Sequence, residues 1–301
     1  MEGRKDTKLL HRLLSFLFRL TAKLPLPLLH AVGTVFGWAI YGMSPNYRKH
    51  LRENLSQAGY GDARVRREAV ASAGKMLAEA PALWFREHEE VAALVREVSG
   101  VDAAYAARAR GEALLFLTPH MGCFEVTAQY LAHKAMAEGL SVNVLYRPSR
   151  LGWLEPVMRA GRSRANVRLA PADVSGVRQL FAALRQREPI GLLPDQVPSR
   201  GEGEWAEFFG RPAYTMTLAA KLAERKGVAC FLAYARRLPH GRGYDIVLRP
   251  FPARQEGESA TRHLNRALEA LVRECPEQYL WGYNRYKVPR GAPPSGSAAL
   301  P

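Results

Sequence analysis

The sequence predicts an α/β fold, in which helices flank a mixed and largely parallel sheet and further apolar helices precede it. Beyond residue 111, short apolar runs bounded by Gly, Pro or polar residues are typical of buried strands. These runs are EALLFLTPH, SVNVLYRP, PIGLLPDQ, GVACFLAYARR and YDIVLRPF. Helical stretches separate several of them, at residues 123–138, 173–187, 215–226 and 259–274. Regular alternation of strand and helix indicates helices packed on a sheet.

The first 45 residues predict a membrane-associated helical segment. Residues 9–20, LLHRLLSFLFRL, mix apolar and basic side chains, as an amphipathic helix at a membrane surface does. Residues 24–43 contain no Lys, Arg, Asp or Glu and approach the length of a membrane span. Pro25, Pro27 and the glycines of this stretch favour interfacial or re-entrant insertion over a full span. A pair of buried helices in a soluble core is the alternative.

The rest of the chain predicts one main domain and a short tail. With 301 residues and no break in composition, we expect a single core over residues 46–288, beginning with two charged, helical stretches. Residues 289–301 are rich in Pro, Gly, Ser and Ala, so we expect a disordered tail.

Charge and cysteine content limit the possible partners and compartment. The formal net charge of +15 predicts an acidic partner, such as anionic lipid, an acidic carrier protein, a phosphorylated substrate or nucleic acid. The three cysteines are isolated, which is typical of a reduced, cytosol-facing compartment. Because zinc-finger spacing and RNP-like blocks are absent, we expect no nucleic-acid partner. The sequence also lacks a Gly-x-Ser-x-Gly elbow and nucleotide-binding glycine motifs, which disfavours serine hydrolases and nucleotide-dependent enzymes.

The stretch TPHMGCFEVTAQ, residues 118–129, holds the strongest candidate for catalysis. On one helix, five residues turn the chain by about 500°, so His120 and Glu125 would point away from each other. The pair can cooperate only across a strand-to-helix turn, with His120 in the loop after ALLFL and Glu125 in the first helical turn. A carboxylate on one ring nitrogen raises the basicity of the other, which then takes a proton from a hydroxyl. The alternatives are an ordinary loop histidine and a metal site that includes His133, although the spacing is not His-Glu-x-x-His.

The stretch that contains His120 and Glu125 is the first of four sequence blocks that occur in a fixed order along the chain. The sequence contains HMGCFE at 120–125, YRP at 146–148, PDQVPSRGEGEWAEFFGRPAYTMTLAAKLAERKGVACFLAYARR at 194–237 and PEQYLWGYNRYK at 276–287. Together they resemble the bacterial lipid A biosynthesis acyltransferases of the late, lauroyl or myristoyl type. These enzymes fall within the wider glycerolipid acyltransferase-like group, which carries a His-x4-Asp/Glu motif. The resemblance extends over about residues 9–288.

The resemblance implies a membrane-bound O-acyltransferase on the cytoplasmic face of the bacterial inner membrane, with a glycerolipid acyltransferase-like fold. Such an enzyme moves an acyl chain from an acyl carrier protein or CoA thioester to a hydroxyl of a lipid A precursor, without metal or cofactor. A lysophospholipid or an amino-acid lysolipid is the alternative acceptor. A non-catalytic basic protein that binds membrane surfaces is the alternative from another class.

The resemblance also implies roles for individual residues. His120 resembles the general base and Glu125 its orienting acid, while Arg147 and Asp195 match polar positions near the active site. Cys123 and Phe124 depart from the commoner His-x-Gly-Asn-Trp-Glu form, which leaves the catalytic pair intact.

Further candidates come from composition and position. We expect the following residues to bind substrate or to line an acyl channel: Arg150 and Arg211 for substrate, and Phe124, Phe208 and Phe209 for the channel. Core packing is the alternative for each Phe. Acyl length, the acceptor hydroxyl, the donor and the oligomeric state do not follow from the sequence.

Overall fold

The computed structural model describes residues 16–149, 151–164, 166–198 and 202–295. Its centre is a seven-stranded sheet with the strand order β1-β9-β8-β2-β5-β3-β4. The strands are β1 (Val95–Ser99), β2 (Ala113–Leu117), β3 (Val142–Tyr146), β4 (Val167–Pro171), β5 (Ile190–Leu192), β8 (Val228–Arg237) and β9 (Tyr244–Pro250). Only β8 and β9 run antiparallel, and the other neighbours are parallel. The predicted mixed, largely parallel sheet is therefore confirmed.

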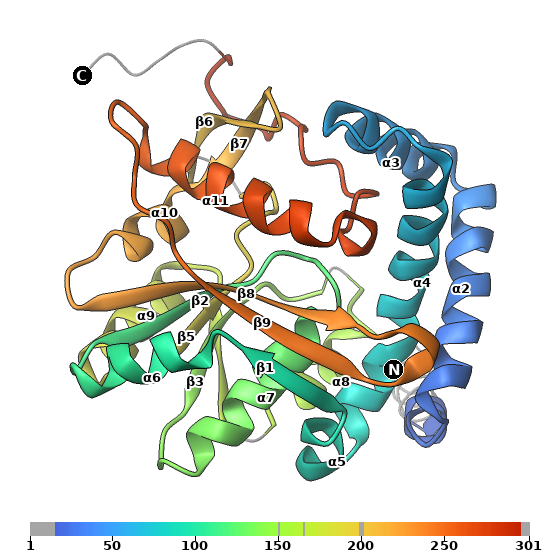
Figure 1. Cartoon of the computed structure of the whole chain (residues 1–301), viewed down its shortest axis with the longest axis horizontal. Coiled ribbons are helices and arrows are strands. Elements are labelled where there is room, and N and C mark those ends of the chain that lie inside the picture. The colour runs from blue at the N-terminus through green and yellow to red at the C-terminus, as the bar shows by residue number, and fades with distance from the viewer. Residues whose placement is uncertain (1–15, 150, 165, 199–201, 296–301) are drawn as a thin grey trace, which may run out of the picture.

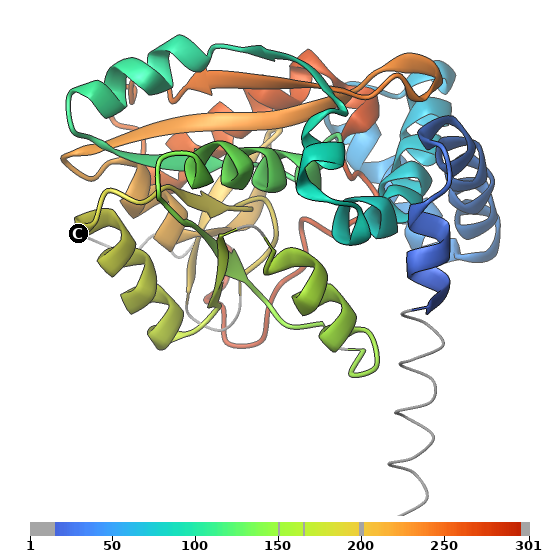
Figure 2. The ribbon, with the colours of Figure 1, turned by 90° about the horizontal axis from the view of Figure 1, so that it is seen from below.

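Helices cover both faces of this sheet (Figures 1 and 2). One face carries α6 (Val101–Ala109) and α7 (Phe124–Met136), and the other carries α9 (Val174–Arg185), α10 (Thr217–Ala223) and α11 (Ala260–Glu274). Strand β2 shows why two layers form, because its side chains alternate between the faces. Leu114 and Phe116 pack in the α7 layer, whereas Leu115 and Leu117 pack in the α9–α11 layer.

Two shorter helices pack beside the longer helices. These are α5 (His88–Ala92) and α8 (Glu155–Arg162).

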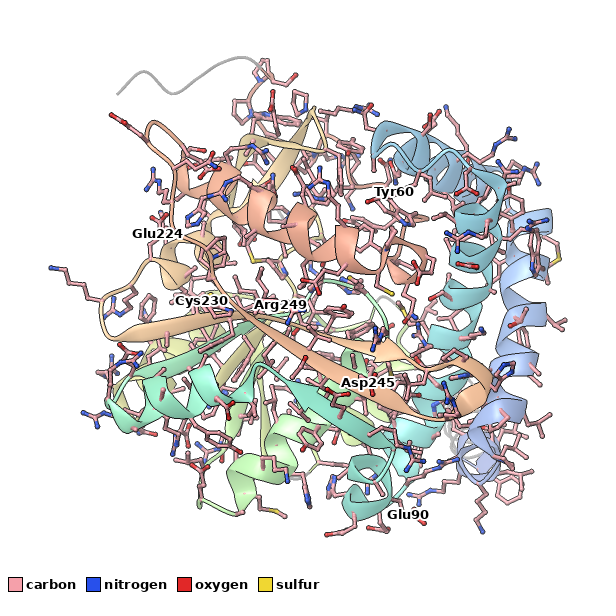
Figure 3. All side chains as sticks on the ribbon, in the orientation of Figure 1. Tyr60, Glu90, Glu224, Cys230, Asp245 and Arg249 are labelled. Atoms are coloured by element: carbon pink, nitrogen blue, oxygen red, sulfur yellow. The ribbon has the colours of Figure 1, made fainter. Side chains whose placement is uncertain are left out.

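The cysteines Cys123, Cys230 and Cys275 are free and buried, and Cys230 belongs to the layer between the sheet and α11 (Figure 3).

The strands that the sequence did not predict are β1, β4 and a hairpin. Strands β1 and β4 form the two edges of the sheet, where outward side chains are solvated. Arg96, Glu97 and Arg168 are accordingly exposed, so neither segment forms an apolar run. The hairpin of β6 (Gly203–Phe208) and β7 (Arg211–Met216) lies outside the main sheet. Its two-residue loop has positive φ at both Phe209 (48°) and Gly210 (73°), as a type I′ turn requires.

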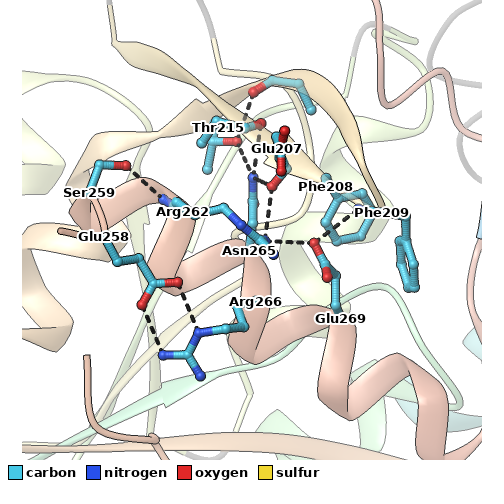
Figure 4. A network of polar contacts seen from close by, with 12 residues as sticks. Glu207, Phe208, Phe209, Thr215, Glu258, Ser259, Arg262, Asn265, Arg266 and Glu269 are labelled. Carbon is cyan, nitrogen blue, oxygen red and sulfur yellow. Dashed lines mark hydrogen bonds and ion pairs between the residues drawn. The ribbon is translucent and has the colours of Figure 1, made fainter. Parts of the chain in front are cut away.

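The helix α11 holds this hairpin in place (Figure 4). The amide of Asn265 donates to the carbonyl of Glu207 at 2.9 Å, and the N–H of Phe209 donates to Glu269 Oε1 at 2.9 Å. Arg262 donates to the same oxygen at 2.7 Å. These buried bonds pair the polar groups of the loop and leave its aromatic rings in the core.

Two N-terminal helices lie side by side at one end of the sheet. They are α2 (Leu26–Met43) and α4 (Ala63–Phe85), and α3 (Pro45–Gln57) joins them (Figure 1). Their backbones touch, because a Cβ on Gly74 would lie 1.9 Å from the Gly33 carbonyl oxygen and 2.4 Å from the Gly37 nitrogen. Close contact between small residues lets two helices pack without intervening side chains.

The outward side of α2 is apolar. By length and composition α2 can cross a membrane, and 28% of its residues are buried. Its large exposed hydrophobic side chains, with those of the short helix at residues 16–22, are Phe16, Leu17, Leu20, Leu28, Val32, Val35, Phe36, Trp38 and Met43. An exposed apolar patch of this kind marks a surface for a membrane or a partner. Most of the amphipathic helix expected at residues 9–20 lies outside the described residues.

The predicted tail is described only in part. In residues 289–295 the chain forms turns, and the Pro293 carbonyl accepts a hydrogen bond from Trp205 Nε1 at 2.7 Å. Residues 296–301 lie outside the described part, so their disorder stays a prediction.

We expect Gly74→Val to destabilise the protein by about 1–3 kcal/mol, because its side chain would push α2 away from α4. Thermal and denaturant unfolding measure this loss. The control is Gly42→Ala, because a Cβ at Gly42 in α2 meets nothing within 4 Å. It should be neutral or stabilise by up to about 1 kcal/mol. Equal losses for the two variants would contradict the close helix contact.

Candidate active site

His120 lies in the loop between β2 and α7, where the sequence predicted it. Its ring Nδ1 is 2.8 Å from Asp195 Oδ1, and its backbone N–H donates to Asp195 Oδ2 at 2.9 Å. Both oxygens of one carboxylate therefore hold this residue. Asp195 follows β5, which is hydrogen-bonded to β2, so the two carboxyl ends meet at one edge of the sheet.

These contacts leave one ring nitrogen of His120 as a hydrogen-bond acceptor. When Nδ1–H donates to Asp195, Nε2 of His120 becomes the acceptor, and the amide nitrogen of Gln196 lies 3.2 Å from it. Burial raises the pKa of Asp195, but the charge of His120 and the hydrogen bonds from its ring and backbone outweigh this effect and lower the pKa overall. An ionised Asp195 fixes the tautomer, and a substrate hydroxyl could replace Gln196 at Nε2.

The structure differs from the sequence prediction in the partner of Glu125. Glu125 does lie in the first turn of α7, but its carboxylate accepts hydrogen bonds from Arg162, with Nε at 2.8 Å and the terminal nitrogen also bonded. The guanidinium of Arg162 lies 5.6 Å from the ring centroids of Trp84 and Tyr146. The carboxylate on His120 is that of Asp195, because strand order brings β5 next to β2. The spacing of residues in the sequence does not show that β5 lies next to β2.

Backbone hydrogen bonds hold the His120 loop at several points. The Leu280 N–H donates to the His120 carbonyl at 2.9 Å, and the Gly122 N–H donates to the Gln278 carbonyl at 2.9 Å. Gly122 has φ of +56°, and a Cβ there would lie 2.0 Å from the Ala235 oxygen. Glycine is therefore required at this position by both conformation and space.

A buried ion pair between Glu79 and Arg237 is hydrogen-bonded to the His120 loop. Arg237 donates to the Gly122 carbonyl at 2.6 Å and to both oxygens of Glu79, with Nε at 3.0 Å from each. His30 Nε2 is 3.1 Å from Glu79 Oε2, and the Tyr244 hydroxyl donates to the same oxygen at 2.9 Å. The pair thus joins α2, α4, β8 and β9 to the His120 loop. Sequence reasoning missed it, although Glu79 in a helix with a buried face and Arg237 at the end of an apolar strand would both need partners.

This network shifts the pKa of its carboxylate. Burial raises the pKa of Glu79, but the charge of Arg237 and the hydrogen bonds from His30 and Arg237 outweigh burial and lower the pKa to about 2. Glu79 therefore stays ionised at neutral pH.

A cavity of about 760 Å³ opens beside His120. Among the sequence candidates, His120, Phe124, Glu125 and Arg147 line it. The Phe124 ring packs against the His120 ring, with centroids 4.9 Å apart. Gln196 also lines the cavity, and its place directly after Asp195 in the PDQ stretch was the available sequence signal.

Other sequence candidates lie elsewhere. Phe208 and Phe209 are buried in the core beside α11 and are not among the residues that line this cavity. The reason is the binding of the hairpin to α11 (Figure 4). Arg211 is also outside the cavity lining, with its guanidinium 4.6 Å from the ring centroid of Tyr286. Arg150 lies outside the described residues.

The structure also bears on nucleophilic chemistry at Cys123 and on metal binding. Cys123 is buried, and burial raises the pKa of its thiol well above the usual value, which leaves it protonated. Within the described ranges there is no group of three or more His, Cys, Asp or Glu side chains placed to hold a metal ion.

Comparison with known proteins points to one family. A model of the bacterial lipid A biosynthesis acyltransferases matches residues 5–288. The chain is 24% identical to lipid A biosynthesis lauroyltransferase of Escherichia coli over 91% of this chain and 90% of the relative. It is 25% identical to the lipid A biosynthesis palmitoleoyltransferase of the same organism, over 89% of this chain and 88% of the relative. It is 23% identical to the lipid A biosynthesis myristoyltransferase of Escherichia coli, over 78% of this chain and 73% of the relative.

We expect Glu79→Gln to destabilise the protein by about 3–5 kcal/mol, because it leaves the Arg237 charge buried without its partner. A carboxylate whose pKa is lowered on folding adds stability above its ordinary pKa of 4.5, and that stability is lost as the pH falls toward about 2. Denaturant unfolding at several pH values should therefore show a smaller acid-dependent loss in Glu79→Gln than in the parent protein.

The control for this measurement is Glu68→Gln on the same helix. Glu68 forms an exposed pair with Arg64 at 3.6 Å, so its loss should cost less than about 0.5 kcal/mol. If the acid-dependent loss of stability is the same with and without Glu79, the ion pair does not have the assigned role.

Proposed function

This chain belongs to the bacterial lipid A biosynthesis acyltransferase family, and we propose that His120 is the general base of its acyl transfer to a lipid A precursor. The donor is a fatty acyl thioester of acyl carrier protein or CoA, and the acceptor is a hydroxyl of the precursor. The observation that carries the proposal is the hydrogen bond between His120 Nδ1 and Asp195, which leaves Nε2 as the base of a residue that lines the cavity.

The reaction is a direct transfer. His120 Nε2 removes the proton of the acceptor hydroxyl as its oxygen attacks the thioester carbonyl carbon. The carbonyl oxygen becomes an oxyanion, which the N–H groups at the start of α7 or the Arg147 guanidinium stabilise. The C–S bond then breaks, and the thiolate takes the proton from His120. Asp195 positions the ring throughout, and a covalent acyl-enzyme is not needed.

The acidic residue of the motif has a different task in this proposal. Glu125 neutralises Arg162 and fixes it in the cavity wall, 5.6 Å from the centroid of Tyr146. Glu125 is thus a positioning residue for the wall, and Asp195 is the positioning residue for the base. Arg147 lines the same cavity and supplies positive charge for a phosphorylated acceptor.

The apolar outer side of α2 supports membrane attachment. We propose that this side and the helix at residues 16–22 enter the bilayer at the cytoplasmic face of the bacterial inner membrane. The net charge of +15 favours a surface of anionic lipid. The contact of α2 with α4 then keeps the cavity close to the lipid that carries the acceptor.

We expect His120→Ala to lose about a hundredfold to ten-thousandfold in kcat, because the general base is removed. Asp195→Asn should also lower kcat by at least about a hundredfold, with little change in KM, because the ring loses its tautomer and orientation. Membranes that contain the protein, an acyl carrier protein thioester and a tetra-acylated lipid A precursor provide the assay, with lysophosphatidic acid as the alternative acceptor.

The matched control is Asp173→Asn, which changes an aspartate that lines the cavity. Asp173 caps α9 through the N–H groups of Ser175 and Gly176, a task that Asn also performs, so transfer should be retained. If transfer survives Asp195→Asn but not Glu125→Gln, then Glu125 orients the base, as the sequence spacing predicts. Product on lysophosphatidic acid alone would keep the mechanism and change the acceptor.

We expect Val35→Glu to weaken binding to vesicles of anionic phospholipid by at least about tenfold, because it puts a charge on the side of α2 that enters the lipid. Vesicle co-sedimentation measures this change. Val288→Glu is the control, since Val35 and Val288 are 70% and 69% exposed but lie on different segments. Unchanged binding of Val35→Glu would argue against membrane attachment through α2.

A further inference from the structure

The cavity beside His120 extends over both faces of strand β3. Val144 and Leu145 are consecutive in β3, so their side chains point to opposite faces, and yet both line the cavity. Val144 packs in the cluster of Ala132 and Ala135 on α7. Leu145 packs in the core on the α9–α11 side. The cavity thus has two branches, here named the α7 branch and the α9 branch, which join at the carboxyl edge of the sheet.

The wall that α9 contributes is mostly apolar, although Asp173 at its start and Arg178 also line the cavity. Val174, Val177 and Phe181 line it at helical spacing, so one stripe of α9 forms this wall. The helix begins beside the carboxyl end of β4 and runs away from that edge, which places Phe181 about 10 Å deeper than Val174. Leu145, Met216 and Leu218 complete the wall.

Phe181 marks the deep end of this branch. Val174 at the mouth is 69% exposed, whereas Phe181 is partly buried against the core. The guanidinium of the exposed Arg225 lies over the Phe181 ring, 5.2 Å from its centroid. Phe181 lines the cavity and Arg225 is not among its described lining residues, so the ring separates the branch from that charge.

The α7 branch holds more polar groups, although Ala128, Val144, Val167 and Leu169 also line it. Glu125, Gln129, Tyr146 and Arg162 line it. Gln129 is 3% exposed, and its Oε1 has no hydrogen-bond partner among the described residues. A buried carbonyl oxygen that stays unpaired costs free energy, so this branch fits a ligand that carries N–H or O–H groups. An alkyl chain offers no such groups.

On the basis of the proposed acyl transfer, we propose that the α9 branch binds the fatty acyl chain of the donor and that Phe181 sets its length. The thioester carbon then lies at the joining point beside His120, and the chain runs along α9 to the Phe181 ring. The polar acceptor enters from the α7 branch and brings its hydroxyl to Nε2 of His120. Donor and acceptor therefore meet at the base from opposite faces of β3.

Substitutions at two depths of the α9 branch should shift the preferred length of the acyl donor in opposite directions. Phe181→Ala lengthens the branch and moves the preferred donor to longer chains, whereas Val177→Phe blocks it one turn above Phe181 and moves the preference to shorter chains. One methylene more or less in an apolar pocket changes kcat/KM by about tenfold or more. The ratio of kcat/KM for long donors to kcat/KM for short donors should therefore shift by at least that factor in each variant.

The test measures kcat/KM for a series of saturated acyl thioesters of acyl carrier protein and of CoA, with a tetra-acylated lipid A precursor. Leu169→Ala is the matched control, because Leu169 is a partly buried residue that lines the α7 branch. It should leave the donor profile unchanged. Thermal unfolding shows whether each variant is folded. If Phe181→Ala does not fold, the donor profile of Val177→Phe tests the inference.

The outcomes separate this inference from the proposed function. If the wild type transfers acyl chains but the folded α9 variants keep its donor profile, the inference is overturned and the proposed function stands. A shift of equal size in Leu169→Ala also overturns it, because the chain is then not confined to the α9 branch. If the wild type transfers to no acceptor, both fail.

Discussion

The arrangement of the active-site loop depends on the buried ion pair between Glu79 and Arg237. Moving two charges out of water is costly, and a buried pair is tolerated only when its remaining donors and acceptors are paired. Arg237 meets this condition through Glu79, Ser72 and the Gly122 carbonyl, and Glu79 meets it through His30 and Tyr244. The network joins the N-terminal helices to the backbone next to His120. In the proposed function, the helices that face the membrane and the base that performs transfer thus share one rigid support.

Several arginines of the chain are held by partners within the fold. Arg162 pairs with Glu125, and Arg168 pairs with Glu188 at 3.1 Å. Arg164 donates to the Trp84 carbonyl at 2.6 Å. Arg162, Arg164 and Arg168 are close in the sequence, but each has a separate partner, so they do not form one continuous surface for anions. Burial and pairing decide which arginines face a substrate.

The sequence predicted the fold well where apolar runs are buried on both faces, as in β2 and β8. It failed at β1 and β4, because an edge strand keeps polar residues such as Arg96 and Arg168 in contact with water. In the site, the strand-to-helix turn placed His120 and Glu125 correctly. The partner of His120 could not be predicted, since Asp195 follows another strand and lies 75 residues away in the chain.

By itself the sequence determined the alternation of strand and helix, the apolar N-terminal segment and the place of His120 at the end of a buried strand. Hydrophobic pattern and local turn chemistry set these features, and both act over a few residues. The tertiary structure decided that Asp195 holds His120, that Glu125 binds Arg162 and that Phe208 and Phe209 enter the core. Each of these depends on strand order or on packing against a distant helix, which no local pattern specifies. Packing between distant elements also leaves one cavity that reaches both faces of β3, so that Val144 and Leu145 both line it.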